Sequence, residues 1–171
     1  MLSLVILVNN MDLSIITVNF NDKEKILDQI QSVKDATSGV IYEQIVSDNG
    51  STDNSVALIR DAHPDVKIIE NGANLGFGAA NNVAAKKAKG EFVLFLNPDM
   101  RVESGSLEKL VKYMRDHEQV GILSCKLVDE HGNFQANAKP RRFPGLLDQL
   151  AIVLKVSQVF PRILDRYLYS D

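Results

Sequence analysis

The stretch Leu13-Ser14-Ile15-Ile16-Thr17-Val18-Asn19-Phe20-Asn21 sets a pattern that the rest of the chain repeats. Its first six residues form a compact run rich in β-branched side chains, which is typical of a buried strand. Short polar residues follow, and Asn21 or Asp22 is suited to cap a helix. The helix itself is predicted by apolar residues at helical spacing, namely Ile26, Leu27, Ile30 and Val33.

The alternation of strand and helix recurs along the chain. Further strands are predicted over 42–47, 66–70, 91–96 and 120–124. Repeated strand–helix units imply an α/β fold with a mostly parallel sheet and helices on both faces. Because the crossovers between parallel strands are right-handed, the carboxyl ends of the strands lie along one edge, where folds of this kind bind ligands.

The later helices have predictable ends. Ser51 or Thr52 is expected to open the second helix, which stops before His63-Pro64. An alanine-rich third helix is expected to end at Gly90, because glycine commonly follows the last helical residue. The fourth helix is predicted by an apolar stripe of Leu107, Leu110, Val111 and Met114.

The pattern changes after residue 124. Residues 126–135 predict a hairpin whose turn contains Gly132. Residues 139–145 form a basic loop bounded by prolines, and residues 146–169 contain two apolar helical patterns separated by Pro161.

Four polar motifs fall at the predicted carboxyl edge of the sheet. The first spans 17–21 and the second 47–53, where Asp48 is placed to accept a hydrogen bond from a nucleoside. The third, 74–78, is rich in glycine, so the backbone can approach an anion at a helix N-terminus. In the fourth, Asp99 is placed to hold a divalent cation against a pyrophosphate. Helix capping or a simple turn is the structural alternative for each of the first, second and fourth motifs.

Composition and spacing exclude several other classes of protein. A net charge of −3 offers no basic excess for nucleic acid. The Gly76-x-Gly78 pair follows the third strand and lacks a third glycine, which argues against a dehydrogenase. The single cysteine, Cys125, allows no intrachain disulfide. The apolar run 2–8 is too short to span a membrane.

Taken in order, the motifs resemble glycosyltransferase family 2, and its rhamnosyltransferase-like members most of all. The resemblance rests on residues 14–21, 47–53, 74–82 and 94–99 and covers roughly 13–144. It implies a GT-A fold that uses a UDP- or dTDP-linked sugar and a divalent metal, Mg²⁺ or Mn²⁺. It also implies an inverting transfer of a sugar, with rhamnose as a candidate, to a hydroxyl of a cell-surface polysaccharide or lipid-linked glycan in the cytoplasm.

The resemblance assigns the site residue by residue. The nucleotide-sugar site would contain Thr17, Val18, Asn19, Asp48, Asn49, Asn74, Gly76, Asn97, Pro98 and Asp99. Asp99 matches the last acid of the family's Asp-x-Asp motif and would ligate the metal. Asn97 stands where many members have an acid, so metal ligation is expected of Asp99 alone.

No catalytic residue is assigned. Attack by a hydroxyl acceptor needs a general base, and in this family that acid lies in an acceptor-side segment, which we expect beyond Asp171. The late acids are better explained as turn or surface residues, namely Asp129, Glu130, Asp165 and Asp171. We therefore expect a chain truncated at its C-terminus and inactive in transfer. A binding fragment is the alternative to a transferase, and a nucleotidyltransferase is disfavoured because residues 19–22 form no basic glycine-rich loop.

These expectations divide the chain into three parts. Residues 1–11 are an N-terminal extension or strand, 12–138 form the nucleotide-sugar-binding domain, and 139–171 carry the basic loop and apolar helices. Lys139, Arg141 and Arg142 form either a solvated basic loop or a contact for a phosphate or an anionic lipid head group. The apolar helices either pack on a further segment or contact a membrane surface peripherally.

Overall fold

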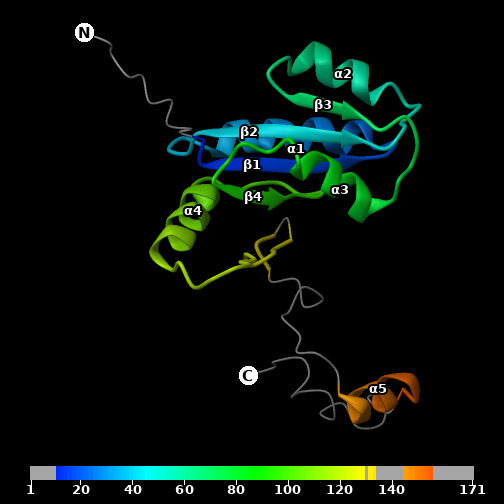
Figure 1. The fold of residues 1–171 in the computed structure, drawn as a ribbon, viewed down its shortest axis with the longest axis vertical. Coiled ribbons are helices and arrows are strands. Elements are labelled where there is room, and N and C mark those ends of the chain that lie inside the picture. The colour runs from blue at the N-terminus through cyan, green and yellow to red at the C-terminus, as the bar shows by residue number, and fades with distance from the viewer. Residues whose placement is uncertain (1–10, 130, 134–144, 156–171) are drawn as a thin grey trace. The chain divides into compact units, whose positions relative to one another are not determined.

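The computed structural model describes residues 11–129, 131–133 and 145–155. The chain divides into two compact units, Met1–Leu123 and Ser124–Asp171. In the described part of the first unit, strands and helices alternate as β1 (Leu13–Asn19), α1 (Lys23–Ala36), β2 (Tyr42–Asp48), α2 (Ser55–Ala62), β3 (Lys67–Glu70), α3 (Phe77–Ala85), β4 (Phe92–Phe95) and α4 (Ser106–Asp116) (Figure 1). The described part of the second unit contains α5 (Leu146–Val153).

The four strands form one parallel sheet in the order β3-β2-β1-β4. Their arrows point the same way in Figure 1, so their carboxyl ends share one edge. The chain moves from β1 through β2 to β3 in one direction and then returns to place β4 on the other side of β1. The predicted parallel sheet is therefore confirmed, and its order reverses beside β1, where α/β folds bind their ligands.

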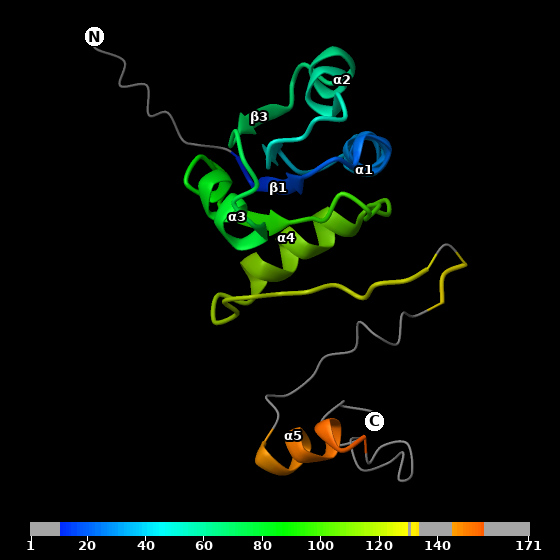
Figure 2. The same ribbon diagram turned by 90° about the vertical axis from the view of Figure 1, so that its right-hand side faces the viewer.

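Helices cover both faces of the sheet, as predicted. On one face, Ile15 of β1 packs with Val33 of α1 and Val111 of α4, and Val46 of β2 packs with Ile59 of α2. The opposite face is covered by α3, whose residue 84 packs against residues 16 and 45 of β1 and β2. Figure 2 shows α3 on one side of the strands and α1 and α2 on the other.

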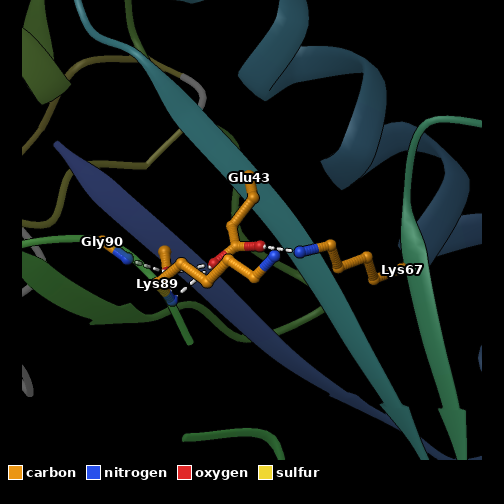
Figure 3. A network of polar contacts seen from close by, with 5 residues as sticks. Glu43, Lys67, Lys89 and Gly90 are labelled. Carbon is orange, nitrogen blue, oxygen red and sulfur yellow. Dashed lines mark hydrogen bonds and ion pairs between the residues drawn. The ribbon is translucent and has the colours of Figure 1, made fainter. Parts of the chain in front are cut away.

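The amino ends of the strands are joined by a buried carboxylate (Figure 3). Glu43 of β2 forms an ion pair with Lys67 of β3 and accepts hydrogen bonds from the Ser14 hydroxyl at 2.6 Å and the Lys89 N–H at 2.7 Å. Burial raises the pKa of Glu43, but these hydrogen bonds outweigh it and hold the pKa below its usual value. The Ser14 Oγ also accepts from the Gly90 N–H at 2.8 Å, so the network ties β1, β2, β3 and the segment before β4 together.

Two helix boundaries and one strand differ from the sequence prediction. The second helix begins at Ser55, not at Ser51 or Thr52, because the latter two are engaged in loop hydrogen bonds. The third ends at Ala85, and Gly90 instead permits close backbone contact, since a Cβ there would lie 2.4 Å from the Ser14 nitrogen. No strand forms at 120–124, where Ile122 is 93% exposed. An apolar run becomes a strand only when a neighbouring strand pairs with it.

The described part of the second unit contains the turn of the predicted hairpin. The Asp129 N–H donates to the Asn133 carbonyl at 2.9 Å, and Gly132 has a φ of 78° in the turn between them. The first apolar helix is present as α5. The predicted strand or extension at 1–10, most of the basic loop at 139–145 and the helix predicted after Pro161 lie outside the described residues.

Candidate functional site

The loops after β1 and β2 are joined through Asn19. Its Nδ2 lies 2.9 Å from Asp48 Oδ1, 3.0 Å from Ser51 Oγ and 2.8 Å from Ser55 Oγ. The Asn49 N–H donates to the Asn19 carbonyl at 2.8 Å. The first two polar motifs therefore form one bonded structure at the carboxyl edge of the sheet.

Asp48 is held inside this structure. The Gly50 and Ser51 N–H groups donate to its Oδ2 at 3.1 and 2.9 Å, and Asn19 donates to its Oδ1. A carboxylate offers about four acceptor positions, and these bonds occupy three of them. The residue is 2% exposed, which makes it an organiser of the loop as well as a candidate ligand contact.

Asn19 and Thr17 lie beneath this edge. Asn19 is fully buried, and within the described residues its Oδ1 has no hydrogen-bond partner. Thr17 is also buried, and its hydroxyl lies 3.4 Å from Gln29 Oε1 of α1. Val18 is half-buried on the opposite face of β1. These three predicted site residues belong to the last part of β1, and Asn19 and Thr17 have almost no surface for a ligand.

A second set of bonds joins the loops after β2 and β3. Asn49 Nδ2 donates to Asn74 Oδ1 at 3.3 Å, and the Gly76 N–H donates to the same oxygen at 2.9 Å. Asn71 Nδ2 reaches Asn49 Oδ1 and Ser47 Oγ, each at 3.0 Å. The third motif is thereby held next to the second.

Gly76 and Asn74 are exposed at the start of α3. Gly76 precedes the helix with a φ of 81°, a backbone conformation that favours glycine. The first N–H groups of a helix have no carbonyl partner within it and attract anions. This end of α3 is therefore suited to a phosphate, with Asn74 shaping the loop beside it.

The fourth motif follows β4, the neighbour of β1. The Leu96 N–H donates to the Ile16 carbonyl at 2.9 Å, which extends the pairing, and the Met100 N–H then closes a turn on the Asn97 carbonyl at 3.1 Å. Pro98 is half-buried, and Asn97 and Asp99 are exposed. The motif thus lies at the carboxyl edge on the far side of β1 from Asp48.

Asp99 is the best candidate for a metal ligand. Nothing in the described part of the chain bonds to its carboxylate. No group of three or more histidine, cysteine or acidic residues that could hold a metal occurs among the described residues. Magnesium commonly takes one or two carboxylates and completes its shell with phosphate and water oxygens. An exposed Asp99, two residues after the exposed Asn97, supplies one carboxylate of such a donor set.

Sequence reasoning missed Asn71, Ser55 and the bridging role of Asn21. Asn71 is the first residue after β3, and Asn21 contacts residues 51 and 52 across the edge. Asn21 lies inside the first predicted motif, whereas Ser55 lies two residues after the second and Asn71 three residues before the third. This proximity to the motifs could have marked the three residues as part of the site. It does not show which partner each residue bonds.

A cavity of about 350 Å³ lies elsewhere, at the amino end of β1, and is a poor candidate. Asp12 pairs with Arg115, and Glu108 Oε1 accepts from the Ser38 and Gly39 N–H groups, while the buried Glu108 Oε2 has no hydrogen-bond partner among the described residues. Those hydrogen bonds lower the pKa of both carboxyls.

Asp129 shows the features of a turn residue, not of a general base. Its carboxylate accepts from the Asn133 and His131 N–H groups at 2.8 and 2.9 Å, and these bonds, the Asn133 bond foremost, hold the pKa of Asp129 below its usual value. Glu130, Asp165 and Asp171 lie outside the described residues. Across the residues that the structure describes, no helix is both long and apolar enough to cross a bilayer.

The curated proteins that this chain resembles are described as glycosyltransferases. An uncharacterized glycosyltransferase of Methanocaldococcus jannaschii is 30% identical over 136 residues, covering 76% of this chain and 47% of the relative. The N-acetylglucosaminyl-diphospho-decaprenol L-rhamnosyltransferase of Mycobacterium tuberculosis is 28% identical over 114 residues, covering 60% of this chain and 36% of the relative. The chain thus spans less than half the length of both relatives.

Solved structures share the fold. TarS of S. aureus in complex with UDP matches with a TM-score of 0.58 and 26% identity over 63% of this chain and 33% of that chain. The mannosyltransferase PcManGT of Pyrobaculum calidifontis, solved with GDP-Man and Mn²⁺, matches with a TM-score of 0.55 and 23% identity. The match covers 60% of this chain and 32% of that chain. The family model described as glycosyl transferase family 2 matches residues 14–164. The chain belongs to this family, and its sheet with helices on both faces is the GT-A arrangement that the motifs predicted.

Proposed function

We propose that this chain binds the donor of an inverting glycosyl transfer, a nucleoside-diphosphate sugar, at the carboxyl edge of its sheet. One observation carries the proposal. Three polar loops are joined by hydrogen bonds beside the point where the strand order reverses, and the exposed Asp99 follows the strand across that point. This is where an α/β sheet binds a ligand.

The nucleotide in the proposal is UDP or dTDP. In the proposal, the carboxylate of Asp48 accepts a hydrogen bond from the base or ribose, and Asn49, Asn74 and Gly76 lie beside the nucleotide. The pyrophosphate lies against the N-terminus of α3. A solved complex of TarS with UDP supports a uridine nucleotide.

Asp99 holds a divalent metal in the proposal, with Asn97 beside it. When bound, the metal neutralises the charge that develops on the leaving pyrophosphate. The carboxylate of Asp99 is exposed and fits a shell completed by phosphate oxygens. The Mn²⁺ in the related mannosyltransferase structure is consistent with this assignment.

Rhamnose and a lipid-linked glycan are the proposed sugar and acceptor. Their support is one relative, the N-acetylglucosaminyl-diphospho-decaprenol L-rhamnosyltransferase of Mycobacterium tuberculosis. In an inverting transfer, the acceptor hydroxyl attacks the anomeric carbon from the face opposite the leaving pyrophosphate, while a general base takes its proton. None of the described residues is proposed as that base.

A peripheral contact of α5 with the cytoplasmic face of a membrane belongs to the same proposal. On α5 and its C-cap, six apolar side chains are exposed, Leu147 to 81%: Leu146, Leu147, Leu150, Ile152, Val153 and Leu154. The basic residues of 139–142 precede this helix in the sequence. Apolar helices flanked by basic residues bind anionic lipid surfaces. Co-sedimentation with vesicles rich in anionic lipid tests this, and equal binding to zwitterionic vesicles would contradict it.

A thermal-shift screen tests the donor site. At a ligand concentration of 100 Kd, binding to the folded state adds about 2.7 kcal/mol, which corresponds to a Tm increase of roughly 5–10 °C for a chain of this size. We expect UDP or dTDP with Mn²⁺ to produce this shift and excess chelator to reduce it. No shift with UDP, dTDP, GDP or their sugars, with or without Mn²⁺, would refute the proposal.

Donor binding without transfer by this chain is the second candidate function. The observation that favours it is the turn role of Asp129, whose carboxylate is engaged within its own loop. The test is a donor-consumption assay with candidate acceptors. Acceptor-dependent turnover would eliminate this candidate.

A further inference from the structure

The loop between β1 and α1 contains a residue in a left-handed backbone conformation. Asn21 has a φ of 53°, a region that few residues other than glycine adopt and that asparagine tolerates best. The side chain is exposed and contributes to none of the hydrophobic core clusters. Core packing therefore does not explain the conformation.

Asn21 instead bonds to the neighbouring loop through both its backbone and its side chain. Its N–H donates to Ser51 Oγ at 3.0 Å. Its Oδ1 accepts from the Thr52 N–H at 2.7 Å and lies 3.4 Å from the Thr52 hydroxyl. In this left-handed conformation, the backbone N–H and the side-chain oxygen of Asn21 bond to two adjacent residues of the loop after β2.

These bonds lead directly to Asp48. The Ser51 Oγ that accepts from Asn21 also accepts from Asn19 Nδ2, and the Ser51 N–H donates to Asp48 Oδ2. A shift of Asn21 would therefore move Ser51 and, through the Ser51 N–H, disturb a hydrogen bond that holds the Asp48 carboxylate. Backbone strain retained at such an edge is expected where geometry serves a ligand.

We infer that Asn21 is a positioning residue for donor binding. It fixes the loop after β1 against the loop after β2 and so sets the orientation of the Asp48 carboxylate. The inference rests on the proposed function, because it assigns a role toward the nucleotide that Asp48 is proposed to contact.

The chain offers a matched control in Asn54. This residue is also left-handed, with a φ of 68°, and it lies in the same region, directly before α2. Its side chain caps no helix N–H and makes no hydrogen bond among the described residues. Replacing either asparagine by glycine keeps the backbone conformation accessible, but only Asn21→Gly removes a bond between the loops.

The experiment measures nucleotide affinity by calorimetry, with UDP and dTDP in the presence of Mn²⁺, together with Tm. We expect Asn21→Gly to raise the Kd by about threefold to tenfold, the equivalent of a lost hydrogen bond. Asn54→Gly should leave the Kd within about twofold of the original protein and lower Tm less than Asn21→Gly does, because the Asn54 side chain makes no hydrogen bond among the described residues. Asn21→Asp keeps the oxygen that accepts from Thr52 and should bind as the original protein does.

The outcomes separate the inference from the proposed function. If the original protein binds no nucleotide, the proposed function fails and the inference fails with it. If the original protein binds and Asn21→Gly binds equally well, only the inference is overturned. A similar loss of affinity in Asn54→Gly, or in Asn21→Asp, would also overturn it, because neither change removes the bond to Thr52.

Discussion

Replacing Asp48 by alanine removes the acceptor of three hydrogen bonds at the carboxyl edge. The donors are Asn19 Nδ2 at 2.9 Å and the N–H groups of Gly50 and Ser51 at 3.1 and 2.9 Å. A hydrogen bond to a charged group contributes about 1.5–3 kcal/mol. The loss is smaller than three times this value, because water reaches the loop N–H groups and Asn19 keeps its serine partners.

We therefore expect Asp48→Ala to lower the free energy of unfolding by about 2–4 kcal/mol and Tm by roughly 5–15 °C. Small domains have about 5–15 kcal/mol of stability, so the variant should remain folded at 25 °C. Urea denaturation followed by circular dichroism measures the stability. Calorimetry with UDP and Mn²⁺ measures the affinity, which should fall at least tenfold.

Asp53→Ala is the matched control for this change. Asp53 lies in the same loop and accepts hydrogen bonds from the Lys23 and Ser55 N–H groups, each at 3.0 Å. Its loss should reduce stability without a comparable effect on affinity. An Asp48→Ala variant with unchanged Tm would refute the loop-organising role. Equal affinities for both variants would refute the assignment of Asp48 to the nucleotide site.

Three further predictions follow from other parts of the molecule. Asp99→Asn should abolish the extra Tm increase that Mn²⁺ gives to a nucleotide while leaving the Tm of the free protein within about 2 °C, since Asp99 is exposed; a retained metal effect would exclude Asp99 as the ligand. The hydrogen bonds that hold the pKa of Glu43 down stabilise the folded chain above pH 4.5, the usual value for a glutamate, and this contribution disappears as the pH falls through the lower folded pKa. Glu43→Gln should therefore flatten the acid side of a plot of unfolding free energy against pH, and an unchanged slope would contradict the argument. Gly90→Ala should cost about 1–3 kcal/mol, because its Cβ would lie 2.4 Å from the Ser14 nitrogen, and urea denaturation showing a cost under about 0.5 kcal/mol would disprove the close approach.

The individual strands could be predicted because the preference of a segment for a strand depends on its own residues. Runs such as 13–18 combine β-branched residues with a polar end, and each such run became a parallel strand where a neighbour was available. The run at 120–124 has similar composition and forms no strand. Pairing depends on which segments meet in space, and a local pattern does not contain that information. For the same reason, the position of β4 beside β1 could not be predicted.

The site was predicted as a set of residues but not as a set of roles. Short polar residues at strand ends serve equally well as ligand contacts and as partners for neighbouring loops. Asn19 was predicted to lie near the nucleotide, yet it is fully buried and bonds to Asp48. Asn74 and Gly76 were predicted on the same grounds and are exposed. Burial distinguishes Asn19 from these two residues, and Asp48 and Asn49, each 2% exposed, are buried as Asn19 is. This difference follows from the packing of the loops, which the sequence does not reveal.

The carboxylate network at the amino ends of the strands has a consequence for hydrogen exchange. The N–H groups of Lys89 and Gly90 precede β4, yet they donate to buried oxygens of Glu43 and Ser14. Amides in such positions exchange with solvent only when the sheet itself opens. The amides of Gly50 and Ser51, in contrast, become free when the loop around Asp48 opens. These two pairs are therefore internal reporters of global and local opening, and a nucleotide that slows exchange at 50 and 51 more than at 89 and 90 closes the loop directly.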